Sequence, residues 1–308
     1  MEKIRLHDAI MDWMEHYKKN SVKPSTYDRL MISLASLEKY EISDVFIDEL
    51  NTIDLQDYLN QLVDDGYALT TIKKQFHLVS GYIQFANLNG DILRPIHKGV
   101  KLPSESAVKK RKREVVSYSH EEQESLKSVL YSGDSPAYYS ALLMLETGMR
   151  IGEALALCWT DIDWKRRAIR ISKTLVRLGD CKNSYIQDSA KSFTSNRTIP
   201  MSKSAYELLD YLRKIEQTSS PFIFHNRRGD YLSYETVRWW IKKACFVAGV
   251  PYYGQHVFRH TFATNCYERG CDVKMLSKML GHSDVTITYN IYIHLFGDAL
   301  EEMRAVVG

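Results

Sequence analysis

The sequence is poor in the residues that mark several specialised classes of protein. Its 308 residues include 5 cysteines, none in a Cys-x-x-Cys pair, together with 15 glycines and 7 prolines. This composition excludes a disulfide-stapled mini-protein, a collagen-like chain and a largely disordered one. The N-terminus also lacks the apolar stretch of a secretory signal, so we expect a reduced protein that works in the cytoplasm.

Long apolar runs and a strong net charge are missing as well. The longest obvious apolar run, Ala141–Leu145, suits a buried helix and is far shorter than the roughly 20 residues that span a bilayer, so we expect no membrane function. The net charge of +3 is too mild by itself to indicate a nucleic-acid partner. Where the charges cluster is more informative than their sum.

The length and the apolar content suffice for two domains, each with its own core. In residues 1–97, apolar side chains recur at helical spacing in four stretches, two of which stop at Gly66 and Gly90. We expect this first domain to be a small all-helical bundle.

A basic segment, residues 98–114, is expected to link the two domains. Between Lys98 and Arg113, seven basic side chains stand against one acid, Glu105; they are Lys98, Lys101, Lys109, Lys110, Arg111, Lys112 and Arg113. Such a run is often only a solvated segment. Its place between two folded domains favours a strap that binds a DNA phosphate backbone.

The second domain is expected over residues 115–296. Ser119 and Glu122 form a predicted capping box at its first helix. Alternating apolar residues within 169–199 predict a short antiparallel sheet, and another strand is predicted at Phe222–Phe224, with helices over most of the remainder. The expected fold class is therefore mainly α with a small antiparallel β-sheet, an α+β arrangement.

A first segment that could carry chemistry surrounds Arg150. One helix is predicted to end at Gly148 and another to begin at once, with Arg150 in its first turn, where the helix dipole disfavours a cation. Arg150 could pair with Glu153, one turn further on. Alternatively, it could point at a bound phosphate.

Two further segments carry histidines. His256, Arg259 and His260 share one side of a predicted helix. Histidines four apart can bind zinc, but the third ligand is missing, so we expect no metal there; capping or buried structural histidines are the other alternative. His282 lies ten residues before Tyr292, whose hydroxyl can attack phosphorus only if a base removes its proton.

Together these segments resemble the signature boxes of the tyrosine recombinase family, the integrases of phages and conjugative transposons. The matching residues, in order, are Met149–Glu153, His256–His260, Leu280–Ser283 and Tyr292. Each box alone is weak evidence for membership of the family, and four boxes in the expected order and spacing are strong evidence. The N-terminal domain resembles the core-DNA-binding domain of the family by size, position and helicity only.

The resemblance implies that Tyr292 attacks a DNA phosphodiester, forming a 3′-phosphotyrosyl link and freeing a 5′-hydroxyl, with no cofactor, ATP or metal. It assigns Arg150 and Arg259 to the phosphate oxygens. His256 would exchange a proton with the tyrosine, and His282 would hydrogen-bond the phosphate.

The family also places a lysine on a β-hairpin loop, where it would protonate the leaving 5′-oxygen. Lys191 stands at that place, six residues before Arg197. Integrases of the family often carry a second lysine two residues on, where this sequence has Phe193. Lys173 and Lys182 are conceivable substitutes for Lys191.

Further implications concern a supporting residue and the partners. Glu153 would orient its neighbours. The partners would be double-stranded DNA attachment sites and three further copies of the chain, forming a homotetramer on two duplexes, and an excisionase or other directionality factor could take part. The tail, residues 297–308, is expected to form a helix that docks on its own domain or on a neighbouring subunit.

Two other functions share this chemistry or this fold. A type IB topoisomerase uses the same chemistry without a tetramer, but the Gly281–Ser283 box and the Thr198–Pro200 stretch favour an integrase. A DNA-binding protein of the same fold would cut nothing. The complete polar set with Tyr292 argues against it, because a binder has no use for a nucleophile.

Overall fold

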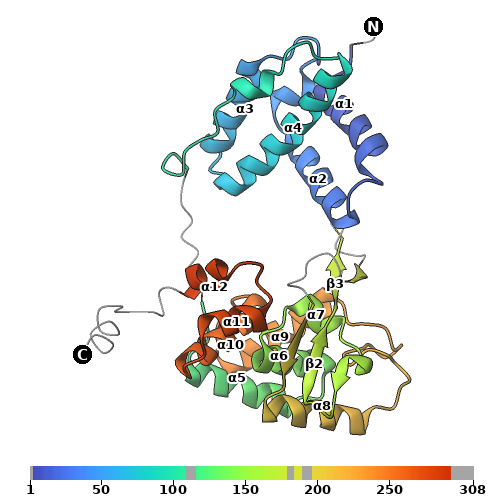
Figure 1. The fold of residues 1–308 in the computed structure, drawn as a ribbon, viewed down its shortest axis with the longest axis vertical. Coiled ribbons are helices and arrows are strands. Elements are labelled where there is room, and N and C mark those ends of the chain that lie inside the picture. Colours follow the sequence, from blue (N-terminus) through green and yellow to red (C-terminus); the bar gives the residue numbers. More distant parts are fainter. Residues whose placement is uncertain (1–2, 109–115, 179–183, 189–195, 293–308) are drawn as a thin grey trace, which may run out of the picture. The chain divides into compact units, whose positions relative to one another are not determined.

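The computed structural model describes residues 3–108, 116–178, 184–188 and 196–292, with side chains described up to residue 289. They form two compact units, one over residues 3–108 and one over residues 116–177, 184–188 and 196–292 (Figure 1). In this part of the chain, no helix has both the length and the apolar composition needed to cross a bilayer.

The N-terminal unit is a helical bundle. Its helices are α1 (Leu6–Trp13), which continues as a π-helical turn at Met14–Lys18, α2 (Pro24–Leu37), α3 (Thr52–Asp64) and α4 (Leu69–Asn89). Helix α4 packs against the other three (Figure 1). It ends at Gly90, whose φ of 85° is a left-handed conformation that glycine adopts without strain. The predicted bundle and this predicted helix end are confirmed.

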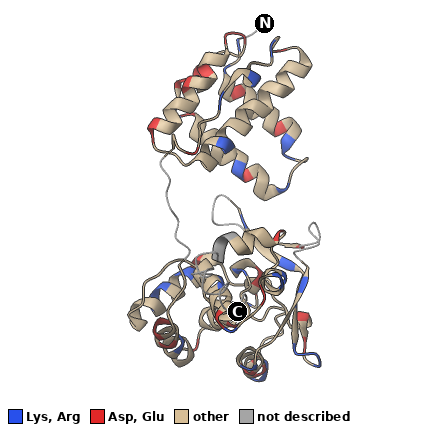
Figure 2. Ribbon diagram, turned by 60° about the vertical axis from the view of Figure 1, so that its left-hand side comes forward, with Lys and Arg blue, Asp and Glu red and all other residues tan. Residues whose placement is uncertain are grey.

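The predicted apolar stripes form the core of this unit. Leu55, Leu59 and Ile83 are each no more than 1% exposed. The core extends past the helices to Val108, which is also buried. Acidic and basic residues are spread over several helices of this unit (Figure 2).

The C-terminal unit is built around one buried helix, α6 (Pro136–Thr147). Its other helices are α5 (His120–Ser132), α7 (Ile151–Leu155), α8 (Lys203–Ile215), α9 (Tyr234–Ala248), α10 (His256–Glu268), α11 (Val273–Leu280) and α12 (Val285–Tyr292). Helix α6 contacts α5, α7, α8, α9 and α10, so its apolar run is buried on all sides, as predicted. The capping box of Ser119 and Glu122 at α5 is confirmed.

The strands form two small antiparallel sheets. One has the order β1 (Ile162–Asp163), β2 (Ala168–Ile171), β5 (Arg197–Pro200), and the other is the hairpin of β3 (Lys173–Arg177) and β4 (Ser184–Asp188). In the first sheet Ile169 lies opposite both Ile162 and Ile199. The fold class, mainly α with small antiparallel sheets, is confirmed.

The predicted strand at Phe222–Phe224 is wrong. Phe222 makes only an isolated bridge with Cys158. Directly after Cys158 the chain forms a short 3-10 helix at Trp159–Asp161. The two segments therefore pair at one residue only, and no strand forms.

Candidate active site

Two glycines let α7 fit tightly between its neighbours. Gly148 ends α6 with a φ of 63°, and a Cβ there would lie 2.3 Å from Cδ1 of Phe262. A Cβ on Gly152 would lie 2.4 Å from the Tyr234 hydroxyl and 2.6 Å from the Leu175 carbonyl oxygen. These glycines therefore place the start of α7, and with it Arg150, directly against α10 and β3.

Arg150 is the N-cap residue of α7 and contacts Glu153 one turn later. Its backbone N–H donates to Glu153 Oε2 (2.8 Å), and its Nη1 donates to Oε1 (2.9 Å). Its Nη2 donates to the Gly281 carbonyl at 3.3 Å. The predicted pairing with Glu153 is confirmed, and because 37% of the Arg150 side chain stays exposed, the guanidinium is also accessible to an anion.

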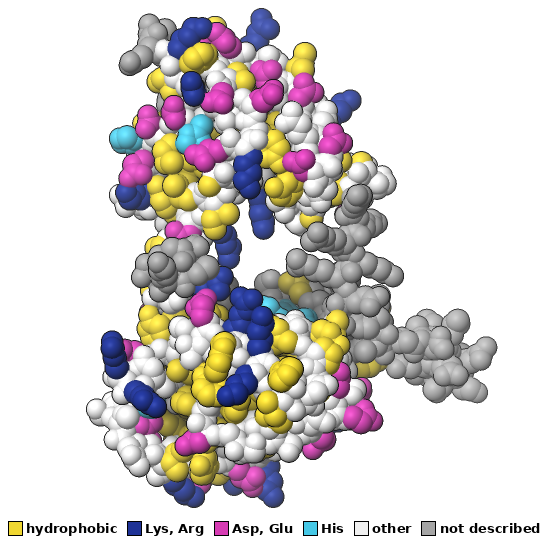
Figure 3. Space-filling model, turned by 180° about the vertical axis from the view of Figure 1, so that it is seen from behind, with side chains coloured by type: hydrophobic (Ala, Val, Ile, Leu, Met, Phe, Trp, Pro, Cys, Tyr) yellow, Lys and Arg dark blue, Asp and Glu magenta, His cyan; other side chains and the backbone are white. Residues whose placement is uncertain are grey.

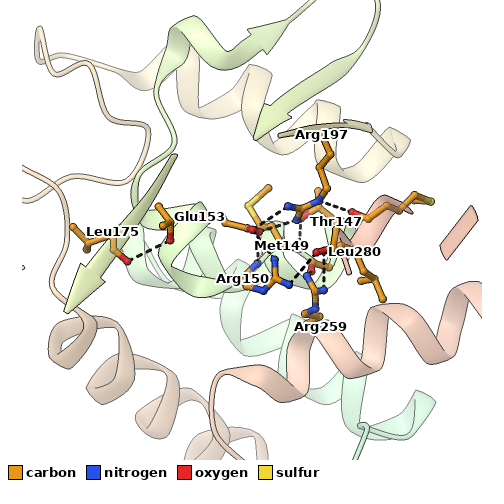
Figure 4. A network of polar contacts seen from close by, with 12 residues as sticks. Thr147, Met149, Arg150, Glu153, Leu175, Arg197, Arg259 and Leu280 are labelled. Atoms are coloured by element: carbon orange, nitrogen blue, oxygen red, sulfur yellow. Dashed lines mark hydrogen bonds and ion pairs between the residues drawn. The ribbon is translucent and has the colours of Figure 1, made fainter. Parts of the chain in front are cut away.

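Arg197, at the start of β5, donates hydrogen bonds to the same carboxylate (Figure 4). Its Nη1 and Nη2 donate to the two oxygens of Glu153 at 2.9 and 2.7 Å, and its Nε donates to the Met279 carbonyl at 2.7 Å. The side chains of Arg197 and Glu153 are each only 6% exposed. No role was predicted for Arg197 from the sequence.

One feature of the sequence does indicate a role for Arg197. Arg197 stands two residues before Ile199, so in a strand the two side chains share a face, and Ile199 is fully buried. An arginine on the buried face of a strand needs an internal anion, and such a buried pair is uncommon enough to mark a site.

The ionisation of Glu153 follows from these contacts. Burial alone would raise the pKa of its carboxyl, but the hydrogen bonds and charge of Arg197, together with the charge of Arg150, lower the pKa to about 2. Glu153 is therefore a carboxylate at any physiological pH.

Arg259, on α10, completes the arginine cluster. Its Nη1 donates to the Gly148 carbonyl at 3.0 Å and its Nη2 to the Leu280 carbonyl at 2.7 Å. With Arg197 on Met279 and Arg150 on Gly281, three successive carbonyls at the end of α11 each accept from a different arginine. The carbonyl end of a helix carries partial negative charge, so this end attracts and orients all three guanidiniums.

The three histidines of the boxes lie beside these cations and are held neutral. Burial, reinforced by neighbouring positive groups, lowers the pKa of His256 and lowers the pKa values of His260 and His282 to about 4. Histidine side chains reach the surface of the C-terminal unit next to a group of Lys and Arg side chains (Figure 3). Among the described residues, no group of three or more His, Cys, Asp and Glu could hold a metal ion.

His282 is also tied to the helix that ends at Tyr292. Its Nδ1 and the hydroxyl of the fully buried Thr288 share a hydrogen bond of 2.7 Å. Tyr292 is the last residue of α12, one turn after Thr288, and its side chain is outside the described part of the structure. The bond fixes α12 relative to the histidine box.

The remaining predicted residues are placed as follows. Lys173 makes an ion pair of 2.9 Å with Asp161, a carboxylate buried in the same unit. Lys98 belongs to a short 3-10 helix of the N-terminal unit, and the backbone of Lys101 exchanges hydrogen bonds with the Gln56 side chain on α3. The other predicted positions, Lys182, Lys191, Lys109–Arg113 and residues 297–308, lie outside the described residues.

Comparison with known proteins identifies relatives of this arrangement. A tyrosine recombinase XerC-like protein of Caldanaerobacter subterraneus is 28% identical over 95% of this chain and 80% of its own length. The transposase from transposon Tn916 of Enterococcus faecalis is 26% identical over 87% of this chain and 69% of its own.

Solved structures share the fold. The Tn1549 transposon integrase in complex with transposon right end DNA superposes with a TM-score of 0.80 at 21% identity, covering 99% of this chain and 100% of that one. A lambda integrase tetramer bound to a Holliday junction gives 0.65 at 18% identity, covering 94% and 78%. Finally, the phage integrase family model matches residues 116–298, more than half of the chain. The chain therefore belongs to the phage integrase family, the tyrosine recombinases.

Proposed function

We propose that this protein is the integrase of a mobile element or phage, a site-specific recombinase that cleaves and rejoins DNA through a 3′-phosphotyrosyl link formed by Tyr292. The observation that carries the proposal is the convergence of Arg150, Arg259 and His282 at the carboxyl end of α11. These residues come from three separate sequence boxes, and they meet next to the helix that ends at Tyr292.

The arginines supply the positive charge that phosphoryl transfer needs. A pentacoordinate phosphorus gathers negative charge on its non-bridging oxygens, and fixed guanidiniums stabilise that charge without reorganising. Arg150 and Arg259 are held in place by carbonyls of the protein itself. They are therefore preorganised for a phosphate.

The histidines suit proton exchange and hydrogen bonding near neutral pH. The lowered pKa of His256 leaves its imidazole neutral, so it can accept the proton of the tyrosine hydroxyl. His282, also neutral, would hydrogen-bond the phosphate. Lys191 would protonate the leaving 5′-oxygen, with Lys173 disfavoured because it is engaged with Asp161.

Helix α12 favours Tyr292 over Tyr289 as the nucleophile. Thr288 is buried and bonded to His282, so its side of α12 is the side that meets the site. Tyr292 stands four residues after Thr288, one turn along that side, whereas Tyr289 is 47% exposed. The Tyr-x-His pattern at Tyr292–His294 agrees with this choice.

The assembly is proposed from the relatives. Tn1549 integrase structures contain transposon DNA, and lambda integrase forms a tetramer on a Holliday junction. By analogy, four copies of this chain would act on two duplexes in the cytoplasm, at the nucleoid, with an excisionase or similar factor setting direction. The units 1–97 and 115–296 would bind DNA, with residues 98–114 as the strap and 297–308 docking between subunits.

The test is covalent capture of DNA. The full chain is incubated with a library of nicked duplexes that carry randomised cores, and DNA that stays attached in detergent but is released by protease is sequenced. Tyr292→Phe should bind the recovered duplex and give no adduct, while Tyr289→Phe should keep most cleavage. An adduct that survives in Tyr292→Phe but not in Tyr289→Phe would reverse the assignment, and binding with no adduct in the unmodified protein would leave a non-cleaving binder.

A further inference from the structure

The two arginines that contact Glu153 differ in what they can reach. All three nitrogens of Arg197 donate to protein acceptors, and its side chain is 6% exposed. Arg150 contacts the same carboxylate but remains 37% exposed. Arg197 is therefore enclosed in protein, and only Arg150 is open to an anion.

The charges explain why both arginines are needed. One carboxylate fully balances one guanidinium, so a Glu153 paired with Arg150 alone would make a neutral pair with little attraction left for a phosphate. Arg197 shares both oxygens of Glu153 and so supplies the balancing charge itself. Arg150 then keeps its position on Glu153 without giving up its own net charge.

Arg197 also joins segments that lie far apart in the sequence. Glu153 is 44 residues away, and the Met279 carbonyl, 82 residues away, lies three residues before His282. One side chain thus connects β5 to the start of α7 and to the carboxyl end of α11 (Figure 4).

From this geometry we propose that Arg197 is a positioning residue of the recombinase site: it neutralises Glu153, so that Arg150 is held in place yet keeps its charge for the DNA phosphate. The inference rests on the proposed function, and it assigns Arg197 no contact with DNA. In this role Arg197 acts through Glu153, and its bond to the Met279 carbonyl fixes the guanidinium beside that carboxylate.

A double-substitution experiment separates this role from simple support of the fold. Single-turnover adduct formation is measured on the recovered duplex, at saturating protein and as a function of protein concentration, for Arg197→Met, Glu153→Gln and the double variant. Arg166→Met, in an exposed turn where the side chain is 85% exposed, is the matched control.

We expect Arg197→Met to slow the saturated rate about 10- to 100-fold, because Glu153 then neutralises the charge of Arg150, with half-saturation little changed. The double variant should react about tenfold faster than Arg197→Met, because the amide of Gln at position 153 no longer neutralises Arg150. If Arg197→Met does not fold, the double variant is compared with Glu153→Gln, and the two rates should agree within about threefold. Arg166→Met should match the unmodified protein.

A double variant no faster than Arg197→Met, or far slower than Glu153→Gln, would show that Arg197 acts independently of Glu153 and overturn the inference. An unmodified rate in Arg197→Met would do the same. These outcomes differ from failure of the proposed function, in which the unmodified protein itself forms no adduct.

Discussion

The two units of this protein differ in whether they bury charged residues. In the N-terminal unit, ion pairs such as Arg5–Asp44 lie at the surface, with side chains 56% and 70% exposed. In the C-terminal unit, Glu153, Asp161 and Arg259 are buried as whole residues. The side chain of Arg197 is buried there as well.

The difference separates stability from chemistry. Exposed pairs contribute little to folding, and an apolar core needs no charge. Buried charges are expensive to desolvate and are kept only with good partners. The C-terminal unit buries charges in spite of this cost, because oriented charges that are shielded from water stabilise a phosphoryl-transfer transition state.

The largest effect should come from removing an accessible arginine of the C-terminal unit. Arg150→Met should slow adduct formation about 10²- to 10³-fold, the loss typical of one oriented donor to a charged transition state. Single-turnover cleavage measures it, and DNA affinity should change far less. A fall in affinity that accounted for the whole loss would mean that Arg150 serves binding and not the chemical step.

The same change made in both units should show the cost of a buried charge directly. Asp161→Ala removes a 2%-exposed carboxylate that pairs with Lys173 and should lower the free energy of unfolding by about 3 kcal/mol. Asp44→Ala removes the exposed partner of Arg5 and should lower it by less than about 1 kcal/mol. Urea denaturation followed by circular dichroism measures both, and equal losses would erase the contrast between the units.

The linker should affect binding but not the chemical step. Replacing Lys109–Arg113 with neutral residues should weaken DNA binding about tenfold at physiological salt and flatten the salt dependence by up to about 0.9 per lost phosphate contact. Fluorescence anisotropy over a salt series measures this, on several unrelated duplexes, because phosphate contacts carry no sequence information. An unchanged slope would leave the segment as a solvated linker.

Acid should weaken the C-terminal unit through its neutral histidines. The pKa values of His260 and His282 are about 4 in the fold and about 6.5 in an unfolded chain. Between these values the unfolded state binds more protons, so their contribution is complete above about pH 6.5 and falls as the pH drops towards 4. The melting temperature of the unmodified protein should fall by a few degrees from pH 7 to about 5. The melting temperature of the His282→Gln variant should fall less over the same range. An equal fall in both proteins would mean that other groups cause the acid sensitivity.

The local features of this protein follow from its amino-acid pattern alone. Apolar spacing of three and four residues predicted the helices, because such neighbours lie on one face of a helix wherever it packs. The pairing of Arg150 with Glu153 was predictable for the same reason, since the two are one turn apart. The resemblance of the sequence boxes to a known family then predicted that distant segments contribute to one site.

How those segments meet depends on the packing of the folded domain. Arg197 reaches Glu153 across 44 residues, and Arg150 reaches the Gly281 carbonyl across 131. Strand alternation could place Arg197 on a buried face, but it could not say which carboxylate waits there, nor that three arginines share the end of one helix. Those choices depend on how α7, α11 and β5 pack, which periodicity along the chain does not encode because it reports only contacts between near neighbours.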